Sequence, residues 1–569
     1  MEIVKRLSIV SIAAVIALAT DPLCAGAREE SGKSDFQTYP AVAALLDSNE
    51  TARGAGAIWE AGSFRYQEAA ATATDEHITT AAGVKLYILP GDGLVYSAAA
   101  FGIGPGDTDP QLKINAALAR MPEAATLILP KGEYLLGYAD KTKHKRDSTT
   151  SPNGGVHGAI YLEKDGQKLI GQGHDTHLNG QGGFRHVVLV RANRCEVRNL
   201  RAGNVTGQLS TAEAAAIGFE PSNFDQGKAN GADIAGLLVE GCWLYDCQSG
   251  VTAHPGSDGA GDNISVMYKP SDLIVRNNKM TGIARQGVEA FQCNEFLLTE
   301  NNIEMGDKGE NTWSRAFRLI GSAHGIVAKN TLKGFSAGAP GYLGVEVSRS
   351  GWYSNPNYSE LAGDIQISGN ELIGFTEALN VQDSAGIIEF SNNRVRGDRA
   401  SKEVIWMVRI VTVGAADPNL EPSADNKNDA PIVVISGNTA TGITRMVDVV
   451  GRAGSVIVTD NFATGNAASN QYALHVVMTP NTVPIIHDLE SIGYLSFRRN
   501  IWIMSDGRTV PPIRVGGLRA TDVVDISDND LTPAGSGEMM IHDGTGTVRH
   551  DSPLNNRAMP RGLFERNHR

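Results

Sequence analysis

A short pattern of apolar and polar positions recurs between Ile274 and Leu531. Each copy has an apolar residue, two mostly polar residues, an asparagine, one variable residue and a second apolar residue, as in VRNNKM, ISGNEL and ISDNDL. The nine asparagines are Asn278, Asn301, Asn330, Asn370, Asn393, Asn438, Asn461, Asn500 and Asn529. Successive ones are 23 to 45 residues apart, and 23 is the interval that recurs most. A fixed minimum with variable excess is typical of a solenoid whose turns carry loops of different length.

Each copy predicts a short strand, a polar bend and a second short strand, because apolar residues alternate with polar ones on both sides of the asparagine. Stacked strands lie about 4.8 Å apart, so equivalent asparagine amides can donate and accept hydrogen bonds along the stack. Such a ladder would satisfy the backbone polar groups of a buried bend. Two earlier turns fit the pattern with Leu200 and Cys242 in place of asparagine. We expect Cys242 to be a small buried filler rather than half of a disulfide.

This arrangement resembles the right-handed parallel β-helix of the pectate-lyase-like superfamily, which includes polysaccharide lyases, glycosidases and phage tailspikes. The resemblance implies an all-β solenoid, and the right-handedness comes from it rather than from the spacing. The segment LILPKGEYLL matches the strand-turn-strand that opens the β-helix in this superfamily.

A helix is predicted just ahead of that segment, over Asp109–Met121, with Asp109 as its N-cap and Pro110 in its first turn. Its apolar face is predicted to consist of Leu112, Ile114, Ala117, Leu118 and Met121. We expect this N-terminal capping helix to cover the open end of the solenoid, which would otherwise expose strand edges.

The chain divides into four predicted parts. Residues 1–27 have the basic start, apolar run and Ala-Gly-Ala site of a signal peptide. Residues 28–100 are expected to form an N-terminal leader and small module, residues 101–540 the β-helix domain, and residues 541–569 a C-terminal tail without repeat. The mature protein is therefore expected to be secreted, either periplasmic or extracellular, with no membrane association after cleavage of the signal.

Charge and cysteine content exclude several partners. The net charge of −13 argues against nucleic acid, which needs a basic face. No Cys or His spacing indicates zinc, and no cofactor is expected, although Asp258 and Asp262 can contribute to a calcium site.

Candidate chemistry lies on the strand that follows each asparagine by about ten residues. Alternation places one column of outward side chains at Thr252, Glu289, Arg318, Glu346 and Asn380. A second outward column begins at His254. Glu289 and Glu346 would be two turns apart, about 9–10 Å, which suits the acid and base of an inverting glycosidase. The same stripe can also be a neutral charge ladder on an exposed sheet.

Arginines and aromatic residues surround this column. Arg285, Arg315 and Arg349 can hold the carboxylates of an acidic sugar chain, and Trp313 and Trp352 can stack on its rings. Elimination from a uronate also needs a base, for which His254 and Tyr353 are candidates.

The leading hypothesis is a secreted enzyme that cleaves a polysaccharide, with a lyase on an acidic polysaccharide ahead of the alternatives. A hydrolase using Glu289 and Glu346, a C5-epimerase and a non-catalytic, tailspike-like glycan-binding adhesin remain open. The catalytic signatures of pectate lyases and polygalacturonases are missing, so the resemblance transfers no catalytic residue. It is compatible with a homotrimer.

Overall fold

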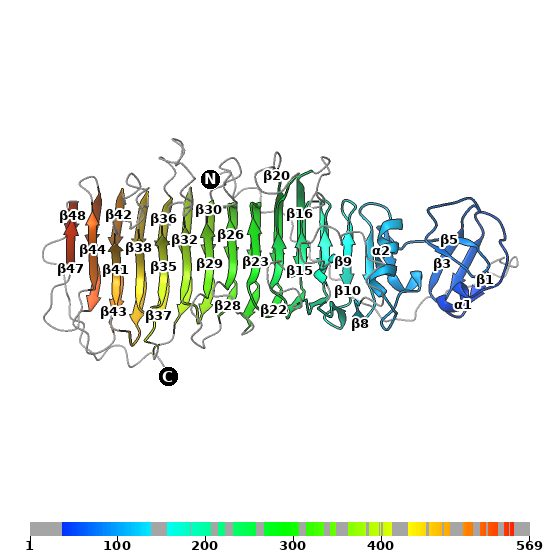
Figure 1. The fold of residues 1–569 in the computed structure, drawn as a ribbon, viewed down its shortest axis with the longest axis horizontal. Helices are drawn as coiled ribbons and strands as arrows, with labels where there is room; N and C mark the ends of the chain where they lie inside the picture. The colour runs from blue at the N-terminus through cyan, green and yellow to red at the C-terminus, as the bar shows by residue number, and fades with distance from the viewer. Residues whose placement is uncertain are drawn as a thin grey trace, which may run out of the picture.

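The protein folds as a long solenoid with a small module at its N-terminal end (Figure 1). The computed structural model describes residues 37–137, 156–182, 184–205, 214–221, 232–257, 267–306, 314–334, 342–348, 362–382, 386–397, 399, 402–411, 431–450, 454–468, 471–477, 493–504, 512–518, 522–532, 540–544 and 547–550. Within them, successive turns contribute strands to three long sheets in which neighbouring strands are parallel. The chain is therefore a right-handed parallel β-helix, as predicted.

The three sheets are named here in the order in which a turn visits them. Sheet I consists of β6 (Val95–Ser97), β7 (Thr126–Leu129), β10 (Lys168–Gly171), β13 (Cys195–Arg198), β16 (Ile234–Glu240), β21 (Pro270–Arg276), β24 (Asn294–Thr299), β27 (Ala323–Ala328), β30 (Gly363–Ser368), β33 (Ile387–Ser391), β36 (Ile432–Ser436), β39 (Ser455–Thr459), β42 (Tyr494–Arg498), β45 (Val523–Ser527) and β48 (Thr547–His550). Sheet II consists of β8 (Gly132–Leu135), β11 (Thr176–Asn179), β14 (Arg201–Gly203), β17 (Trp243–Tyr245), β22 (Lys279–Ile283), β25 (Asn302–Met305), β28 (Thr331–Lys333), β31 (Glu371–Ile373), β34 (Arg394–Arg396), β37 (Thr439–Ile443), β40 (Phe462–Gly465), β43 (Ile501–Ile503) and β46 (Asp530–Thr532). Sheet III consists of β9 (Val156–Leu162), β12 (Phe184–Val190), β15 (Ala215–Phe219), β18 (Ser249–Ala253), β23 (Gln286–Phe291), β26 (Arg315–Ile320), β29 (Leu343–Ser348), β32 (Glu377–Gln382), β35 (Trp406–Val411), β38 (Arg445–Val450), β41 (Tyr472–Val477), β44 (Ile513–Leu518) and β47 (Met540–Gly544).

The predicted asparagine ladder lies at the bend between sheets I and II, and all nine asparagines are buried. Each side-chain amide donates to the amide oxygen of the next asparagine, at 2.9–3.1 Å from Asn278 through to Asn529. The same oxygen accepts the backbone N–H of the preceding asparagine, as Asn370 does from Asn330 at 2.9 Å. Cys242 continues the stack, because its N–H donates to Asn278 at 2.9 Å. The predicted register and the role of Cys242 are thus confirmed.

The ladder also fixes the backbone just before it. The residue that precedes each ladder position has a left-handed φ of 52–65°. Glycine or asparagine occupies several of these positions, but Glu300, Lys329 and Arg499 adopt the same conformation. Side chains with a Cβ are uncommon there. The hydrogen bonds of the neighbouring asparagine therefore determine the bend more strongly than local preference does.

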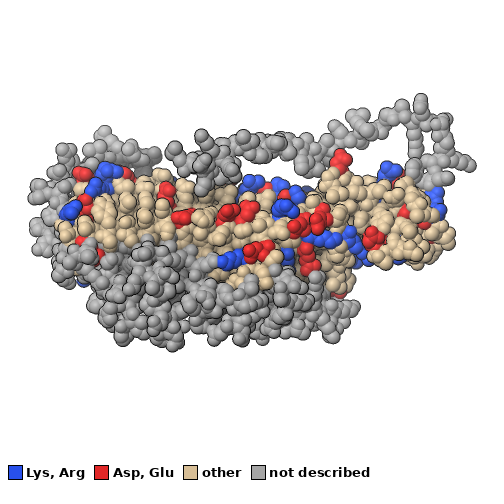
Figure 2. Space-filling view, turned by 90° about the horizontal axis from the view of Figure 1, so that it is seen from above, with Lys and Arg blue, Asp and Glu red and all other residues tan. Residues whose placement is uncertain are grey.

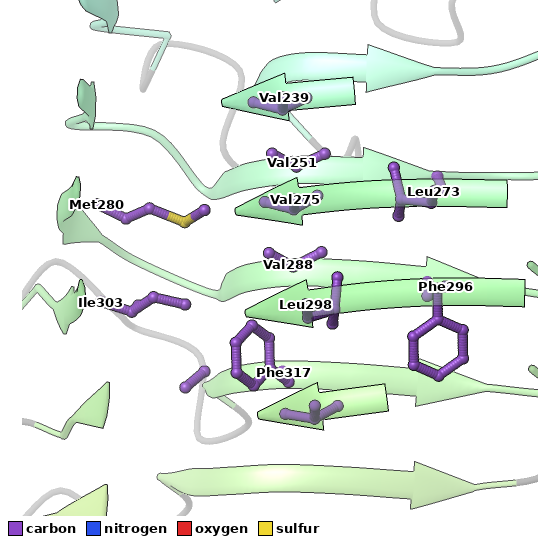
Figure 3. Close-up of a cluster of buried hydrophobic side chains, with 14 of the residues drawn as sticks. Val239, Val251, Leu273, Val275, Met280, Val288, Phe296, Leu298, Ile303 and Phe317 are labelled. Carbon is purple, nitrogen blue, oxygen red and sulfur yellow. The ribbon is translucent and has the colours of Figure 1, made fainter. Parts of the chain in front are cut away.

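The interior is a column of apolar side chains contributed by all three sheets. Figure 3 shows Val239, Val275 and Leu298 of sheet I stacked beside Val251 and Val288 of sheet III. Alternation produces this core, as in β30, where two isoleucines are buried between exposed polar residues. The cysteines at positions 195, 242, 247 and 293 are also buried, and each is a free thiol. Burial raises the pKa of the Cys242 thiol to about 12, so the thiol stays protonated.

A small module precedes the solenoid. Its elements are β1 (Gln37–Tyr39), α1 (Val42–Leu46), β2 (Ile58–Ala61), β3 (Phe64–Glu68), β4 (Ile78–Thr79) and β5 (Lys85–Ile88). Sheet I already begins with β6, upstream of the expected boundary at residue 101. At the other end, β47 and β48 continue the sheets to His550, so the repeat extends beyond the expected start of the tail. Two short strands, β19 (Gly256–Ser257) and β20 (Met267–Tyr268), pair outside the long sheets.

The predicted helix is present as α2 (Pro110–Arg120), preceded by a one-turn 3-10 helix over Ala98–Phe101. Asp109 occupies the N-cap position, but its side chain makes no capping hydrogen bond, contrary to the prediction. Leu112 is exposed rather than on the buried face, and Gln111 is buried instead. Asn115 of α2 accepts from the N–H of Tyr161 at 2.9 Å and donates to the carbonyl of Ala159 at 2.8 Å. It thereby satisfies two backbone groups of the edge strand β9.

We expect the helix to protect this edge strand. Replacing Asn115 with alanine should lower the free energy of unfolding by about 1–2 kcal/mol, because two backbone groups lose their side-chain partner. Thermal unfolding followed by circular dichroism measures the effect, and Lys113→Ala on the exposed face of α2 is the control. Equal melting temperatures for the two variants would show that α2 does not support β9. A soluble monomer lacking residues 28–122 would show that the whole cap is dispensable.

Candidate functional site on sheet III

The predicted outward column is present in register on sheet III. Thr252, Glu289, Arg318, Glu346 and Asn380 are direct cross-strand partners. The same column continues beyond the predicted set through Arg409, Asp448 and His475. A run of charged residues along one column was therefore only partly identified from the sequence.

The central group is held together by ion pairs. Arg318 Nη1 donates to Glu289 Oε1 at 2.7 Å, and Arg318 Nε lies 3.7 Å from Glu346 Oε2. Arg315 Nε also donates to Glu346 Oε2. Glu289 is completely buried, and the Glu346 side chain is only 5% exposed. The alternation predicted that this column faces solvent, and the prediction is wrong for Glu289 and Glu346, whose ion pairs lie in a largely water-excluded environment.

This burial distinguishes the group from charge pairs elsewhere on the solenoid. On the outer face of sheet I, Glu240 forms ion pairs with Arg198 and Arg276, both at 2.7 Å, and the three side chains are 18–44% exposed. Figure 2 shows acidic and basic side chains interspersed on the face that it displays. Exposed pairs of this kind contribute little to stability and prevent repulsion between neighbouring strands. The buried pairs on sheet III lie in a region of lower dielectric constant, where the attraction between opposite charges is stronger.

A second buried group lies two turns toward the N-terminus and was not identified from the sequence. His186 Nε2 lies 3.0 Å from Glu220 Oε1, and Arg185 Nη2 lies 3.6 Å from the same oxygen. His186 and Glu220 are both fully buried. A Cβ at Gly218 would lie 2.9 Å from Cγ of His186, so the absence of a side chain there provides the space for the imidazole. The sequence signal that could have found Glu220 is its register, because Glu220 follows β15 as His254 follows β18.

His254 adjoins this group. Its backbone N–H donates to the carbonyl of Phe219 at 3.0 Å, and its ring packs edge-on against Phe291 with centroids 4.7 Å apart. Burial by itself raises the pKa of Glu220, but Arg185, His186 and His254 outweigh it and hold the pKa well below the usual range. Burial lowers the pKa of His186, although Glu220 opposes the shift. The pair is therefore an ionised carboxylate beside a neutral imidazole at neutral pH.

These shifts predict that acid destabilises the fold. A lowered carboxyl pKa contributes stability above the unfolded-state value, about 4.3 for glutamate, and this is lost as the pH falls through the folded-state value. A lowered histidine pKa also costs stability as the pH falls below about 6.5, because the unfolded state then binds more protons. We expect the melting temperature to decrease from pH 7 to pH 4. With the measurement extended to pH 3, Glu220→Gln should flatten the part of the decrease that lies below about pH 4.3, where the parent carboxylate loses its contribution; an unchanged slope there would contradict the assignment.

The other predicted site residues fall into separate places. Arg285 lies just ahead of β23, at the opposite end of the strands from His254. Its backbone N–H donates to the carbonyl of Gln248 at 2.8 Å. Arg285 has no ion-pair partner among the residues that the structure describes. Asn380 donates to Glu377 of its own strand. Trp313, Arg349, Trp352, Tyr353, Asp258 and Asp262 lie outside the described residues.

Neither a metal site nor a membrane-spanning helix is found in the described ranges. There, no group of three or more histidine, cysteine, aspartate or glutamate residues is placed to hold a metal ion. No helix in those ranges has the length and apolarity needed to cross a membrane.

Comparison with known proteins identifies similar folds. No family model and no curated protein matches the chain. Tailspike protein 2 of bacteriophage CBA120 is 11% identical, with a TM-score of 0.41 over 73% of this chain and 57% of the tailspike chain. The A-module of a mannuronan C-5 epimerase from Azotobacter vinelandii is 14% identical, with a TM-score of 0.41 over 80% and 99% of the two chains. An exopolygalacturonase from Thermotoga maritima is 13% identical, with a TM-score of 0.42 over 73% and 93%. These values are low, and the fold assignment rests on the three sheets described above.

Proposed function

We propose that the protein is a secreted lyase that cleaves an acidic polysaccharide bound along the outer face of sheet III. The observation that carries the proposal is the combination of histidines and arginines on adjacent strands of this face. His254 lies between the Arg185–His186–Glu220 group and the Glu289–Arg318–Glu346 group. Elimination needs a base and a cation that stabilises the substrate carboxylate, and it needs no activated water.

In the proposed reaction, His254 removes the proton from the carbon next to the uronate carboxylate. The electron pair forms a carbon–carbon double bond as the neighbouring carbon–oxygen bond to the leaving sugar breaks. The leaving oxygen takes up a proton, so the atoms balance without hydrolysis. Arg318 is the most exposed cation of the central group, with 21% of its side chain accessible, and is proposed to face the substrate carboxylate.

Arg285 supports an acidic substrate in a second way. The charges of Glu289 and Glu346 are balanced by Arg318 and Arg315, whereas Arg285 is unopposed by a carboxylate in the described part of the chain. Its charge would therefore add net attraction for a polyanion. Because it lies at the other end of the strands, it would contact a neighbouring sugar unit or a side of the chain away from His254.

The hydrolase alternative uses Glu289 and Glu346 as acid and base. Both carboxylates accept hydrogen bonds from arginine, and a carboxylate in that arrangement acts as an acceptor rather than as a proton donor. An inverting glycosidase needs one of them to donate a proton to the leaving oxygen. The ion pairs therefore favour elimination over hydrolysis at this position.

One assay separates the activities. The purified protein is incubated with alginate, polygalacturonate, hyaluronan and a neutral glucan, and ultraviolet absorbance and reducing ends are followed together. New absorbance with new reducing ends on a uronate polymer supports the proposal. Reducing ends without absorbance indicate a hydrolase, altered uronate stereochemistry by NMR indicates an epimerase, and binding without any chemical change indicates a glycan-binding protein; each would overturn it.

A further inference from the structure

A third cluster of charged and aromatic side chains lies on sheet III, toward the C-terminus from the proposed catalytic groups. It is formed by β32, β35, β38 and β41, which are adjacent strands in register. Its cations are Arg409 and Arg445, and its aromatic residues are Trp406 and Tyr472. None of these residues was identified as part of a site from the sequence.

Each arginine uses one terminal nitrogen for an internal carboxylate. Arg409 Nη1 donates to Glu377 Oε1 at 2.8 Å, and Arg445 Nη1 donates to Asp448 Oδ1 at 2.8 Å. Asp448 also accepts from His475, whose ring stacks on Tyr472 with centroids 4.9 Å apart. These contacts fix the guanidinium groups in place, and neither Nε donates a hydrogen bond to a carboxylate of the described residues.

Three buried N–H donors in this cluster have no acceptor among the described residues. They are Nε of Arg409, Nε of Arg445 and Nε1 of Trp406. Arg409 Nε lies 3.6 Å from Asp448, beyond hydrogen-bond distance. Both guanidinium groups pack on the Trp406 ring, at 4.9 and 5.8 Å from its centre, so the three donors lie around one ring.

An isolated donor of this kind does not mark a site. Trp502 Nε1 also lacks an acceptor in the described structure, but Trp502 is an inward-facing residue of the core. The Trp406 cluster differs because it lies on the outer face and contains three such donors, two of them on guanidinium groups that pack on the Trp406 ring. Buried donors without partners are costly, so a ligand that supplies acceptor oxygens would be bound favourably.

We propose that Trp406, Arg409 and Arg445 form a subsite for the carboxylate of an acidic sugar unit. A carboxylate presents two acceptor oxygens and suits the Nε edge of an arginine better than a neutral hydroxyl does. The subsite is three strands from Arg318, about 14 Å by strand spacing, which is within reach of one oligosaccharide lying along the solenoid. It deepens the proposed function and rests on it for the acidic nature of the substrate.

Binding of oligouronates tests the subsite separately from cleavage. Calorimetric titrations use the full chain with His254→Ala, to prevent turnover, and tetragalacturonate, tetramannuronate and a neutral glucan tetrasaccharide as probes. We expect at least one uronate to bind and the neutral probe to bind much more weakly. Adding Trp406→Phe, which removes one donor and keeps an aromatic ring, should weaken uronate binding about tenfold.

Trp243→Phe is the matched control, because Trp243 Nε1 already donates to Thr281 at 2.9 Å and lies on sheet II. It should leave the affinity unchanged. Arg445→Gln is the second variant, checked for folding by circular dichroism. Unchanged affinity in Trp406→Phe, equal binding of the neutral probe or no uronate binding would overturn the subsite. Uronate binding that depends on Trp406, in a parent protein that forms no double bond, would overturn the lyase proposal and keep the subsite.

Discussion

Replacing Asn370 with leucine should lower the free energy of unfolding of the solenoid by about 3 kcal/mol, more than a substitution of similar size outside the ladder. Asn370 Oδ1 accepts both the backbone N–H and the side-chain amide of Asn330, each at 2.9 Å. Its own amide donates to the carbonyl of Val327 at 2.9 Å. Leucine can replace none of these bonds, so at least two buried backbone groups lose a partner, at about 1–3 kcal/mol each.

The control is Asn302→Leu, which changes the exposed residue next to ladder residue Asn301. The backbone N–H of Asn302 bonds to Asn278 at 2.8 Å and is retained in that variant. Melting temperatures from calorimetry should fall clearly for Asn370→Leu and remain near wild type for Asn302→Leu. Similar values for both would mean that the ladder does not stabilise the bends.

The second large effect is expected on activity. His254→Ala should reduce elimination by at least about 100-fold, the usual contribution of a positioned general base. The melting temperature should fall only modestly, because the ring contact with Phe291 is lost but the backbone hydrogen bond of His254 to Phe219 is retained. His177→Ala on sheet II is the matched control and should retain the parent rate.

Glu289→Gln distinguishes the site from a purely structural charge ladder. Because Glu289 is fully buried and bound to Arg318, this substitution should lower stability as well as activity. If His254→Ala keeps the parent rate while Glu289→Gln only lowers the melting temperature, the central group is structural and the chemistry lies elsewhere. Full activity in His254→Ala would by itself remove this histidine from the mechanism.

The buried group in the first turns of the solenoid was not predicted from the sequence. The ladder asparagines begin at Asn278, so no asparagine of the ladder marks the bends that precede β12 and β15. Glu220 and His186 were missed for this reason, although Glu220 occupies the same register position as His254. Their contact also depends on Gly218, whose missing side chain admits the imidazole. Nothing in a strand pattern indicates that kind of space.

The sequence by itself determined the solenoid, its register and the first five members of the outward column. It did so because each turn repeats one chemical requirement, an amide that satisfies a buried bend, and because strand alternation then assigns every side chain to a face. The tertiary structure alone decided which outward residues are buried and which ones pair. Glu289 and Glu346 were expected in solvent and are instead enclosed, because exposure depends on what packs over a face, and alternation reports only the direction of a side chain.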